Sequence, residues 1–512
     1  MKLDLGKIFR KEHQVCLALF IITFLSRYLF SEKYFFDGDT VGVALGSISY
    51  SLQDTRPHLP GYFLHVKFIS ILDLLIKDLH LTMLLVSAFY SSLGAALSYL
   101  LLKKWFNENT SLLITALVIF NPLVWFQGVS PEVYSFDLLM SASFVLLALD
   151  KRGIYFTPII LAIGSGVRQT SGLLLFPLYI FLWYQMIRSK EISLMKFIMA
   201  HLLGLSALLI WFVPMIKSTG GLIEYISLYK TNSPLPNINL LQNIFQFSSY
   251  CFFVFTPLIL LLAPLVFKKK TFNILPDEKK IVQIILFWLI PSLITFILFT
   301  YHKGYFLISI LPLYASIGIL AEKKLLNQSA LLLVLVIEII FFVMMPFREL
   351  SFSSIIKPQK RDNNLFNTWV DRTFSSYLMS ISRIKYQDET MSELSDHIIK
   401  QKLETVFLDP TVYLAARGLQ IRFPSVRFIT MDYYLEDSFI EYKGLGIAVR
   451  KGMKDRLKNT LLITRKDFFE SEIRKHLIDE LILKKFVSAK INDYSETQLY
   501  DLYSNLFLRN SK

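Results

Sequence analysis

Residues Phe35–His65 read FFDGDTVGVALGSISYSLQDTRPHLPGYFLH, a polar segment between long apolar segments of the chain. It brings four ionisable groups close together in the sequence: Asp37, Asp39, Arg56 and His58. In a membrane protein, such a segment lies at the depth of the lipid headgroups, where a lipid-linked substrate presents its polar part. The stretch therefore indicates a membrane fold and chemistry on a lipid-linked substrate.

The composition predicts a multi-pass membrane protein. Hydrophobic residues make up 54% of the 512 residues, and they cluster in blocks long enough to cross a bilayer. About eleven such blocks are found by the length criterion of roughly 20 residues. They cover 14–31, 81–102, 110–128, 133–149, 154–170, 171–187, 194–216, 244–267, 281–300, 304–321 and 328–346.

The net charge of +14 is a topology signal, because Lys and Arg lie mostly at the ends of the apolar blocks. It therefore does not indicate nucleic-acid binding. If Gly61–Ile76 lies along the membrane surface, most basic clusters fall on the same face as the N-terminus; if it crosses, every later cluster moves to the other face. We therefore predict a cytoplasmic N-terminus, an extracytoplasmic first loop at 32–80 and an interfacial helix at Gly61–Ile76.

Beyond residue 346 the chain becomes rich in charged residues, with strand-like runs at 405–408 and 446–449. These features predict a transmembrane domain at 1–346 and a soluble, extracytoplasmic α/β domain at 347–512. The two cysteines, Cys16 and Cys251, lie in apolar blocks and indicate no disulfide framework. The first apolar block lacks a small-residue cleavage site, so we expect it to remain as the first span.

Asp37 and Asp39 are candidate catalytic acids. Transfer of a sugar from a polyprenyl phosphate needs a base for the acceptor's proton and a cation for the departing phosphate. Either Asp could instead cap the helix that follows it. Their spacing is also compatible with a shared divalent cation. No cofactor is required, because cationic side chains can stabilise the same leaving group.

The segment RPHLPGY at 56–62 provides candidate ligands for the donor phosphate. Its two prolines restrict the backbone, and the helix that follows presents its N-terminus to an anion. We expect Arg56 and His58 to bind the phosphate and Tyr62 to contact the substrate. The alternative is a rigid turn whose Arg reaches the headgroups.

Further candidates lie in other loops on the same predicted face. Arg168 stands near the end of an apolar block, where a charge is costly unless a partner such as the donor phosphate is present; an interfacial Arg is the alternative. The turn YHKGY at 301–305 adds His302 and Lys303 as phosphate ligands, or as an interfacial belt.

Three further residues are candidate contacts to sugar hydroxyls, namely Glu132, Tyr134 and Tyr305. Glu132 could instead be a favourable acid at a helix start. Glu338 lies inside the last apolar block and is more typical of an interhelical hydrogen bond.

An early Asp followed by RPHLPGY resembles the first extracytoplasmic loop of the GT-C superfamily of integral-membrane glycosyltransferases. The resemblance is closest to the branch that contains protein O-mannosyltransferases and lipid A aminoarabinose transferases. GSGVRQTSGLLLFPLY at 164–179 and HKGYFLISILPLY at 302–314 are similar to further features of that branch. The resemblance extends over residues 10–346. This sequence differs from the usual pattern in Leu59 and in having DGDT in place of an Asp-Glu pair.

The resemblance implies an inverting transfer from a polyprenyl-phosphate sugar to an extracytoplasmic acceptor, which would be a protein, a glycolipid or an envelope polymer. By motif position it assigns the general base to Asp39, with Asp37 as the alternative. The expected location is the cytoplasmic (inner) membrane. Two other functions stay open: a transporter or flippase of lipid-linked sugars, or an inactive membrane part whose external domain binds partners.

Overall fold

The computed structural model describes residues 11–36, 38–232, 276–299, 303–345, 380–408, 415–431, 438–451, 461–465, 477–482 and 486–491, with isolated residues between 240 and 262. It divides into two compact units. The helical unit contains the chain up to Ser31, Leu59–Phe347 and a piece ending at Arg383. The sheet unit contains Glu32–His58 and the chain from Ile384 onward.

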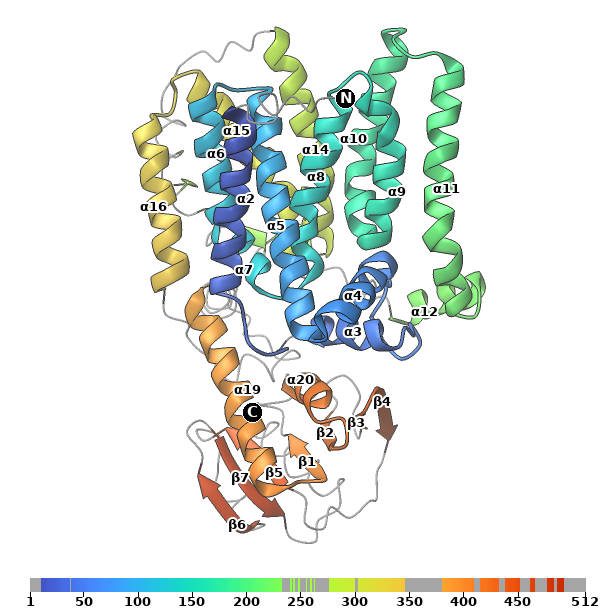
Figure 1. Cartoon of the computed structure of the whole chain (residues 1–512), viewed down its shortest axis with the longest axis vertical. Coiled ribbons are helices and arrows are strands. Elements are labelled where there is room, and N and C mark those ends of the chain that lie inside the picture. The colour runs from blue at the N-terminus through green and yellow to red at the C-terminus, as the bar shows by residue number, and fades with distance from the viewer. Residues whose placement is uncertain are drawn as a thin grey trace. The chain divides into compact units, whose positions relative to one another are not determined.

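The helical unit is a bundle (Figure 1) of α-helices with short 3₁₀ turns between some of them. In chain order the helices and turns are α2 (Lys11–Leu29), α4 (Phe63–Ile76), α5 (Leu79–Lys103), α6 (Glu108–Phe120), α7 (Pro122–Val129), η1 (Val133–Ser135), α8 (Phe136–Ala148), η2 (Gly153–Phe156), α9 (Thr157–Val167), α10 (Gln169–Arg188), α11 (Leu194–Ser218), α12 (Leu222–Asn232), α14 (Pro276–Phe299), η3 (Lys303–Phe306), α15 (Leu307–Glu322) and α16 (Gln328–Met344).

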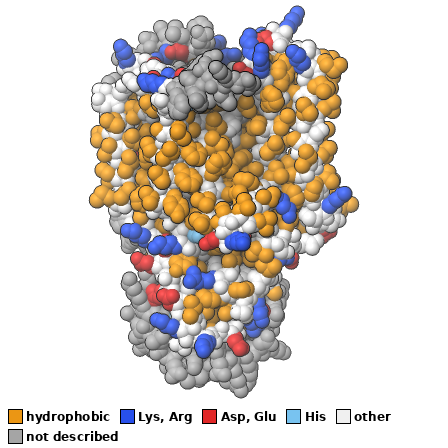
Figure 2. Space-filling model, in the orientation of Figure 1, with side chains coloured by type: hydrophobic (Ala, Val, Ile, Leu, Met, Phe, Trp, Pro, Cys, Tyr) orange, Lys and Arg blue, Asp and Glu red, His pale blue; other side chains and the backbone are white. Residues whose placement is uncertain are grey.

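The helical unit is that of a multi-pass membrane protein. By length and apolar composition, four helices in the described part can cross a bilayer, and α6 with α7 makes a fifth candidate. Three shorter apolar helices lie at Val133–Ala148, Gly153–Val167 and Gln328–Met344. Figure 2 shows hydrophobic side chains covering the face of this unit that is in view. Large apolar residues of the unit, such as Leu173 and Ile210, are exposed. Such a surface is stable in lipid rather than in water.

One predicted span is wrong as a continuous helix. The block at 110–128 is broken into α6 and α7, which meet at an angle of 57°. Pro122 cannot donate a backbone hydrogen bond to the preceding turn, and it disfavours helical geometry at Asn121. The Asn121 side chain instead accepts a bond from the amide of Leu123 at 3.1 Å. The predicted block at 244–267 lies almost wholly outside the described residues.

The ends of the helices agree with the charge pattern. Glu108 lies 2.8 Å from Lys11 and 4.0 Å from Lys103, so α2 begins at the end of the bundle where α5 finishes. It follows that α5 begins at the end where α2 finishes, and that α4 does not cross between them. α4 has 14 residues, which make a rod of about 21 Å in a hydrocarbon layer about 30 Å thick.

α4 also has the surface of an interfacial helix. His65, Val66 and Ile69 are buried against the bundle, whereas Leu74 and Leu75 expose about three quarters of their surface. Apolar side chains left outside on a helix that is too short to span favour a position at the membrane surface. This agrees with the interfacial helix predicted at Gly61–Ile76.

The sheet unit has a seven-stranded sheet in the order β4-β3-β2-β1-β5-β7-β6. β1 is parallel to β2 and β5, and the other neighbours are antiparallel. The C-terminal α/β prediction is thus confirmed, and the runs at 405–408 and 446–449 form β1 and part of β4. The elements are α3 (Gly38–Ile48), α19 (Ile381–Gln401), β1 (Thr405–Leu408), α20 (Ala415–Arg422), β2 (Arg427–Met431), β3 (Ser438–Lys443), β4 (Gly446–Lys451), β5 (Leu461–Arg465), β6 (Leu477–Ile482) and β7 (Phe486–Ile491).

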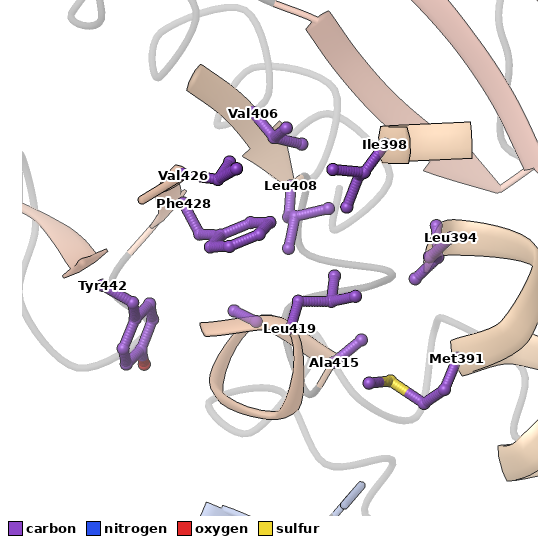
Figure 3. Close-up of a cluster of buried hydrophobic side chains, with 11 residues drawn as sticks. Met391, Leu394, Ile398, Val406, Leu408, Ala415, Leu419, Val426, Phe428 and Tyr442 are labelled. Carbon is purple, nitrogen blue, oxygen red and sulfur yellow. The ribbon is translucent and has the colours of Figure 1, made fainter. Parts of the chain in front are cut away.

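The segment Glu32–His58 packs within the sheet unit, although it precedes most of the helical unit in sequence. Tyr34 and Phe36 contact the hydrophobic core that α19, α20 and the sheet form (Figure 3). The backbone amide of Lys33 donates to Asp388 of α19 at 2.7 Å. The polar loop is therefore built on the C-terminal part of the chain.

Candidate functional site

Glycines on one face of α3 allow the return segment of the loop around Asp39 to pack closely against the helix. Gly38, Gly42 and Gly46 are spaced four residues apart and therefore share one face of the helix. A Cβ on Gly46 would lie 2.9 Å from the ring of Pro57, and one on Gly42 would lie 3.1 Å from the carbonyl oxygen of Thr55. The return segment 55–57 thus lies directly on the helix backbone.

This close packing brings Asp39 and His58 together. Asp39 is in the first turn of α3, where the helix N-terminus favours a carboxylate. His58 Nδ1 lies 3.6 Å from Asp39 Oδ1. The Asp39 side chain is 53% exposed and that of His58 is 29% exposed. A half-exposed carboxylate beside an imidazole can accept a proton from a bound hydroxyl and pass it on.

Arg56, the predicted phosphate ligand next to this pair, has a partner within the loop. Its Nη2 donates to Asp54 Oδ2 at 2.6 Å, and the Ser51 hydroxyl donates to the same oxygen at 2.7 Å. The hydrogen bond from Ser51, followed by the Arg56 guanidinium, holds the pKa of Asp54 below its ordinary value. Arg56 and Ser51 also form a short antiparallel bridge that closes the turn.

Arg417 of α20 joins the two ends of the loop. Its Nη1 donates to the carbonyl of Gly38 at 2.9 Å, and its Nη2 donates to the Thr55 hydroxyl at 3.1 Å and to the Thr55 carbonyl at 3.4 Å. Sequence reasoning missed this residue, because nothing in the letters around Arg417 links it to a loop almost four hundred positions earlier.

In the helical unit, Arg168 is fully buried at the break between α9 and α10. It forms an ion pair with Asp137 of α8, which is also fully buried and accepts a hydrogen bond from Ser171. From the sequence we expected a donor phosphate to balance Arg168, and the partner Asp137 was not predicted. The signal was present, because an acid within a predicted span calls for a partner in another span.

Two neighbouring tyrosine rings complete this cluster. The guanidinium carbon of Arg168 lies 4.5 Å from the ring centre of Tyr134 and 4.6 Å from that of Tyr305. Gly304 makes the approach of the rings feasible, because a Cβ there would lie 2.3 Å from the Tyr134 ring. Within the described part of the chain, Nε and Nη2 of Arg168 have no hydrogen-bond partner. The predicted residues Arg168, Tyr134 and Tyr305 are thus together.

The end of the RPHLPGY segment reaches the same helix break. The Pro60 carbonyl accepts hydrogen bonds from the Gln169 side chain and the Tyr225 hydroxyl, both at 3.2 Å. Tyr62, which follows, is almost completely buried. Leu64 fills the space beside Gly166, because a Cβ on Gly166 would lie 2.5 Å from the Leu64 side chain. Segment 60–64 is therefore fixed against the start of α10.

The remaining predicted residues are Glu132, Glu338, Asp37, His302 and Lys303. Glu132 directly precedes η1, and Glu338 accepts a hydrogen bond from Tyr314 of a neighbouring helix, as expected for an interhelical contact. Asp37, His302 and the Lys303 side chain are not among the described residues. In the described part, no three His, Cys, Asp or Glu residues group as metal ligands. The divalent metal on Asp37 and Asp39 stays a prediction.

The fold resembles that of a solved membrane enzyme. The apo crystal structure of ArnT from Cupriavidus metallidurans matches 92% of this chain and 97% of its own, with a TM-score of 0.50 and 12% sequence identity. The chain has the fold of ArnT. The same enzyme bound to undecaprenyl phosphate matches 95% of this chain and 98% of its own, with a TM-score of 0.49 and 10% identity. No family model and no curated protein sequence matches the chain.

ArnT is a lipid A aminoarabinose transferase of the GT-C superfamily. The resemblance inferred from the loop and the two shorter motifs is therefore confirmed at the level of the fold. Because that likeness covers almost the whole of both chains, it includes the C-terminal part as well as the residues 10–346 that the motifs indicated. At 12% identity it transfers no residue roles, so these rest on the geometry of this chain.

Proposed function

We propose that the protein is a membrane glycosyltransferase that moves a sugar from a polyprenyl-phosphate carrier to an acceptor outside the cytoplasmic membrane. The Asp39–His58 pair carries this proposal. It is exposed enough to meet a substrate, and α3 holds it in a loop of defined geometry. The ArnT-like GT-C fold supports the reaction class.

In the proposed step, an acceptor hydroxyl oxygen attacks the anomeric carbon of the donor sugar and forms the new glycosidic bond. The bond from that carbon to the phosphate oxygen breaks, and its electron pair leaves with the polyprenyl phosphate. The acceptor proton moves to the Asp39 carboxylate, and His58 stabilises the charge and carries the proton onward. Attack opposite the leaving group inverts the anomeric carbon.

We retain Arg168 of the helical unit as a candidate ligand of the donor phosphate. Arg168 is held by Asp137 and the two tyrosine rings, and it retains two nitrogens that can donate to an anion. Because Asp137 neutralises much of its charge, we expect Arg168 to contribute directed hydrogen bonds more than net attraction. Arg56, His302 and Lys303 remain further candidates.

The test is sugar transfer by the purified protein in liposomes with a radiolabelled polyprenyl-phosphate sugar. We expect Asp39→Asn to lower turnover by about 10²- to 10⁴-fold, which is the usual contribution of a general base. Stability should fall by no more than about 1 kcal/mol, because the side chain is half exposed and loses only its interaction with the helix N-terminus. Asp396→Asn, which removes an exposed acid from α19, is the matched control. Full turnover by Asp39→Asn would show that Asp39 is not the base, and Asp37→Asn would then be the next variant.

The second candidate function is transport of lipid-linked sugars. The 57° break between α6 and α7, and the buried Asp137–Arg168 pair at another break, resemble the interrupted helices of transporters. Translocation of a fluorescent sugar lipid across liposomes, with no covalent product, would favour this function. Transfer that depends on Asp39 would exclude it as the main activity.

A further inference from the structure

We propose that Arg417, from the C-terminal part of the chain, is a positioning residue that sets the distance between Asp39 and His58. The inference rests on the proposed function, since it assigns a role in the same proton transfer. It also gives the sheet unit a task in catalysis: the unit would hold the catalytic loop in shape rather than bind a separate partner.

Arg417 contacts one residue close to each member of the Asp39–His58 pair. Gly38, whose carbonyl accepts from Nη1, immediately precedes Asp39. Thr55, whose hydroxyl and carbonyl accept from Nη2, is three residues before His58. One planar guanidinium therefore fixes the start of α3 relative to the return segment, and its fork geometry restricts both directions at once.

Thr55 shows why the loop needs such a support. It has a φ of 53°, in the left-handed region that a β-branched residue rarely adopts. A residue in this region keeps its conformation only when its surroundings hold it there. The two hydrogen bonds from Arg417 and the contact with Gly42 supply that restraint.

Arg417 itself is firmly anchored. Its neighbours Ala415, Ala416 and Leu419 are buried in the core of the sheet unit. The Gln420 side chain donates to the carbonyls of Gly444 at 3.0 Å and Gly446 at 2.8 Å, which connects α20 to the turn between β3 and β4. Since both terminal nitrogens of Arg417 point to the loop, the residue is suited to positioning rather than to binding a donor.

The first experiment measures steady-state kinetics of the full-length protein with Arg417→Gln and Arg417→Lys. Positioning predicts that kcat falls by about 10- to 100-fold, the usual effect of a small misplacement of reacting groups, and that KM for the donor stays within about twofold. Arg417→Lys should recover part of kcat, because an ammonium can keep one or two of the hydrogen bonds. Arg427→Gln, whose partner Glu441 lies within the sheet, is the control.

The second experiment follows hydrogen exchange of the backbone amides in residues 38–58. Arg417→Gln should increase exchange in this segment and leave α19 unchanged, whereas Arg427→Gln should not affect it. A raised donor KM with unchanged kcat would overturn the proposal and make Arg417 a donor ligand. Unchanged kinetics and exchange would also overturn it. If the wild-type protein transfers no sugar but exchange rises as expected, the structural role stands and the proposed function fails.

Discussion

Asp137→Asn is the variant that best tests how the helical unit tolerates its buried charges. Asn has the shape of Asp and keeps an oxygen that can accept the hydrogen bond from Ser171. The substitution therefore removes the negative charge and little else. Arg168 would be left as a fully buried cation whose charge no other acid paired with it in the described part of the chain balances.

The expected cost is about 3–5 kcal/mol, which is typical when one partner of a buried ion pair is removed. The two tyrosine rings next to Arg168 recover part of this, at about 0.5–2 kcal/mol each, and we therefore expect the lower half of the range. At roughly 2 °C per kcal/mol for a large domain, the unfolding midpoint should fall by about 6 °C.

The assay is thermal unfolding of the purified protein in detergent, followed by near-UV circular dichroism, with Asp396→Asn as the control for loss of an exposed acid. The pair Asp137→Leu with Arg168→Met should recover most of the lost stability, because apolar residues of similar volume replace a buried ion pair at little cost. An Asp137→Asn midpoint equal to that of the wild type would refute the reasoning. A stable double variant that still transfers sugar would show that Arg168 does not bind the donor phosphate.

Two further predictions concern residues of the sheet unit. Gly46→Ala should destabilise the fold by about 1–3 kcal/mol through overpacking against Pro57, and it should lower turnover. Gly38→Ala is the control, because a Cβ there would have its nearest contact at 3.6 Å, and it should unfold like the wild type. Equal denaturation midpoints for the two variants would contradict the packing of α3. Burial raises the pKa of Asp388 to about 6, so the folded state binds its proton more tightly than the unfolded state. Stability should therefore fall as the pH rises from about 4 to 6, and then level off. Asp388→Asn should flatten that part of a plot of urea midpoint against pH, and an unchanged slope would contradict the assignment.

The sequence predicted the membrane class, a short separate helix within Gly61–Ile76 and the C-terminal α/β region, because periodicity, charge pattern and helix length are local properties. It also selected Arg168, Tyr134 and Tyr305, which the structure brings together at 4.5 and 4.6 Å. It could not predict that Asp137 balances Arg168, since the pairing of two spans depends on how helices pack. Arg417 could not be predicted either, because its contacts with Gly38 and Thr55 depend on how distant parts of the chain pack.

The spacing of glycines in DGDTVGVALG was visible in the sequence, but only the structure gives it a meaning. Gly46 leaves no room for a side chain beside Pro57, and Gly42 leaves little beside the Thr55 carbonyl. Arg417 holds the same segment through hydrogen bonds to Gly38 and Thr55. The loop therefore has the geometry of a packed core rather than that of a flexible surface segment. Asp39 can act as a base of fixed position only if both restraints hold. The helix glycines and the C-terminal arginine should consequently be needed together, so that Gly46→Ala adds little to the loss already caused by Arg417→Gln.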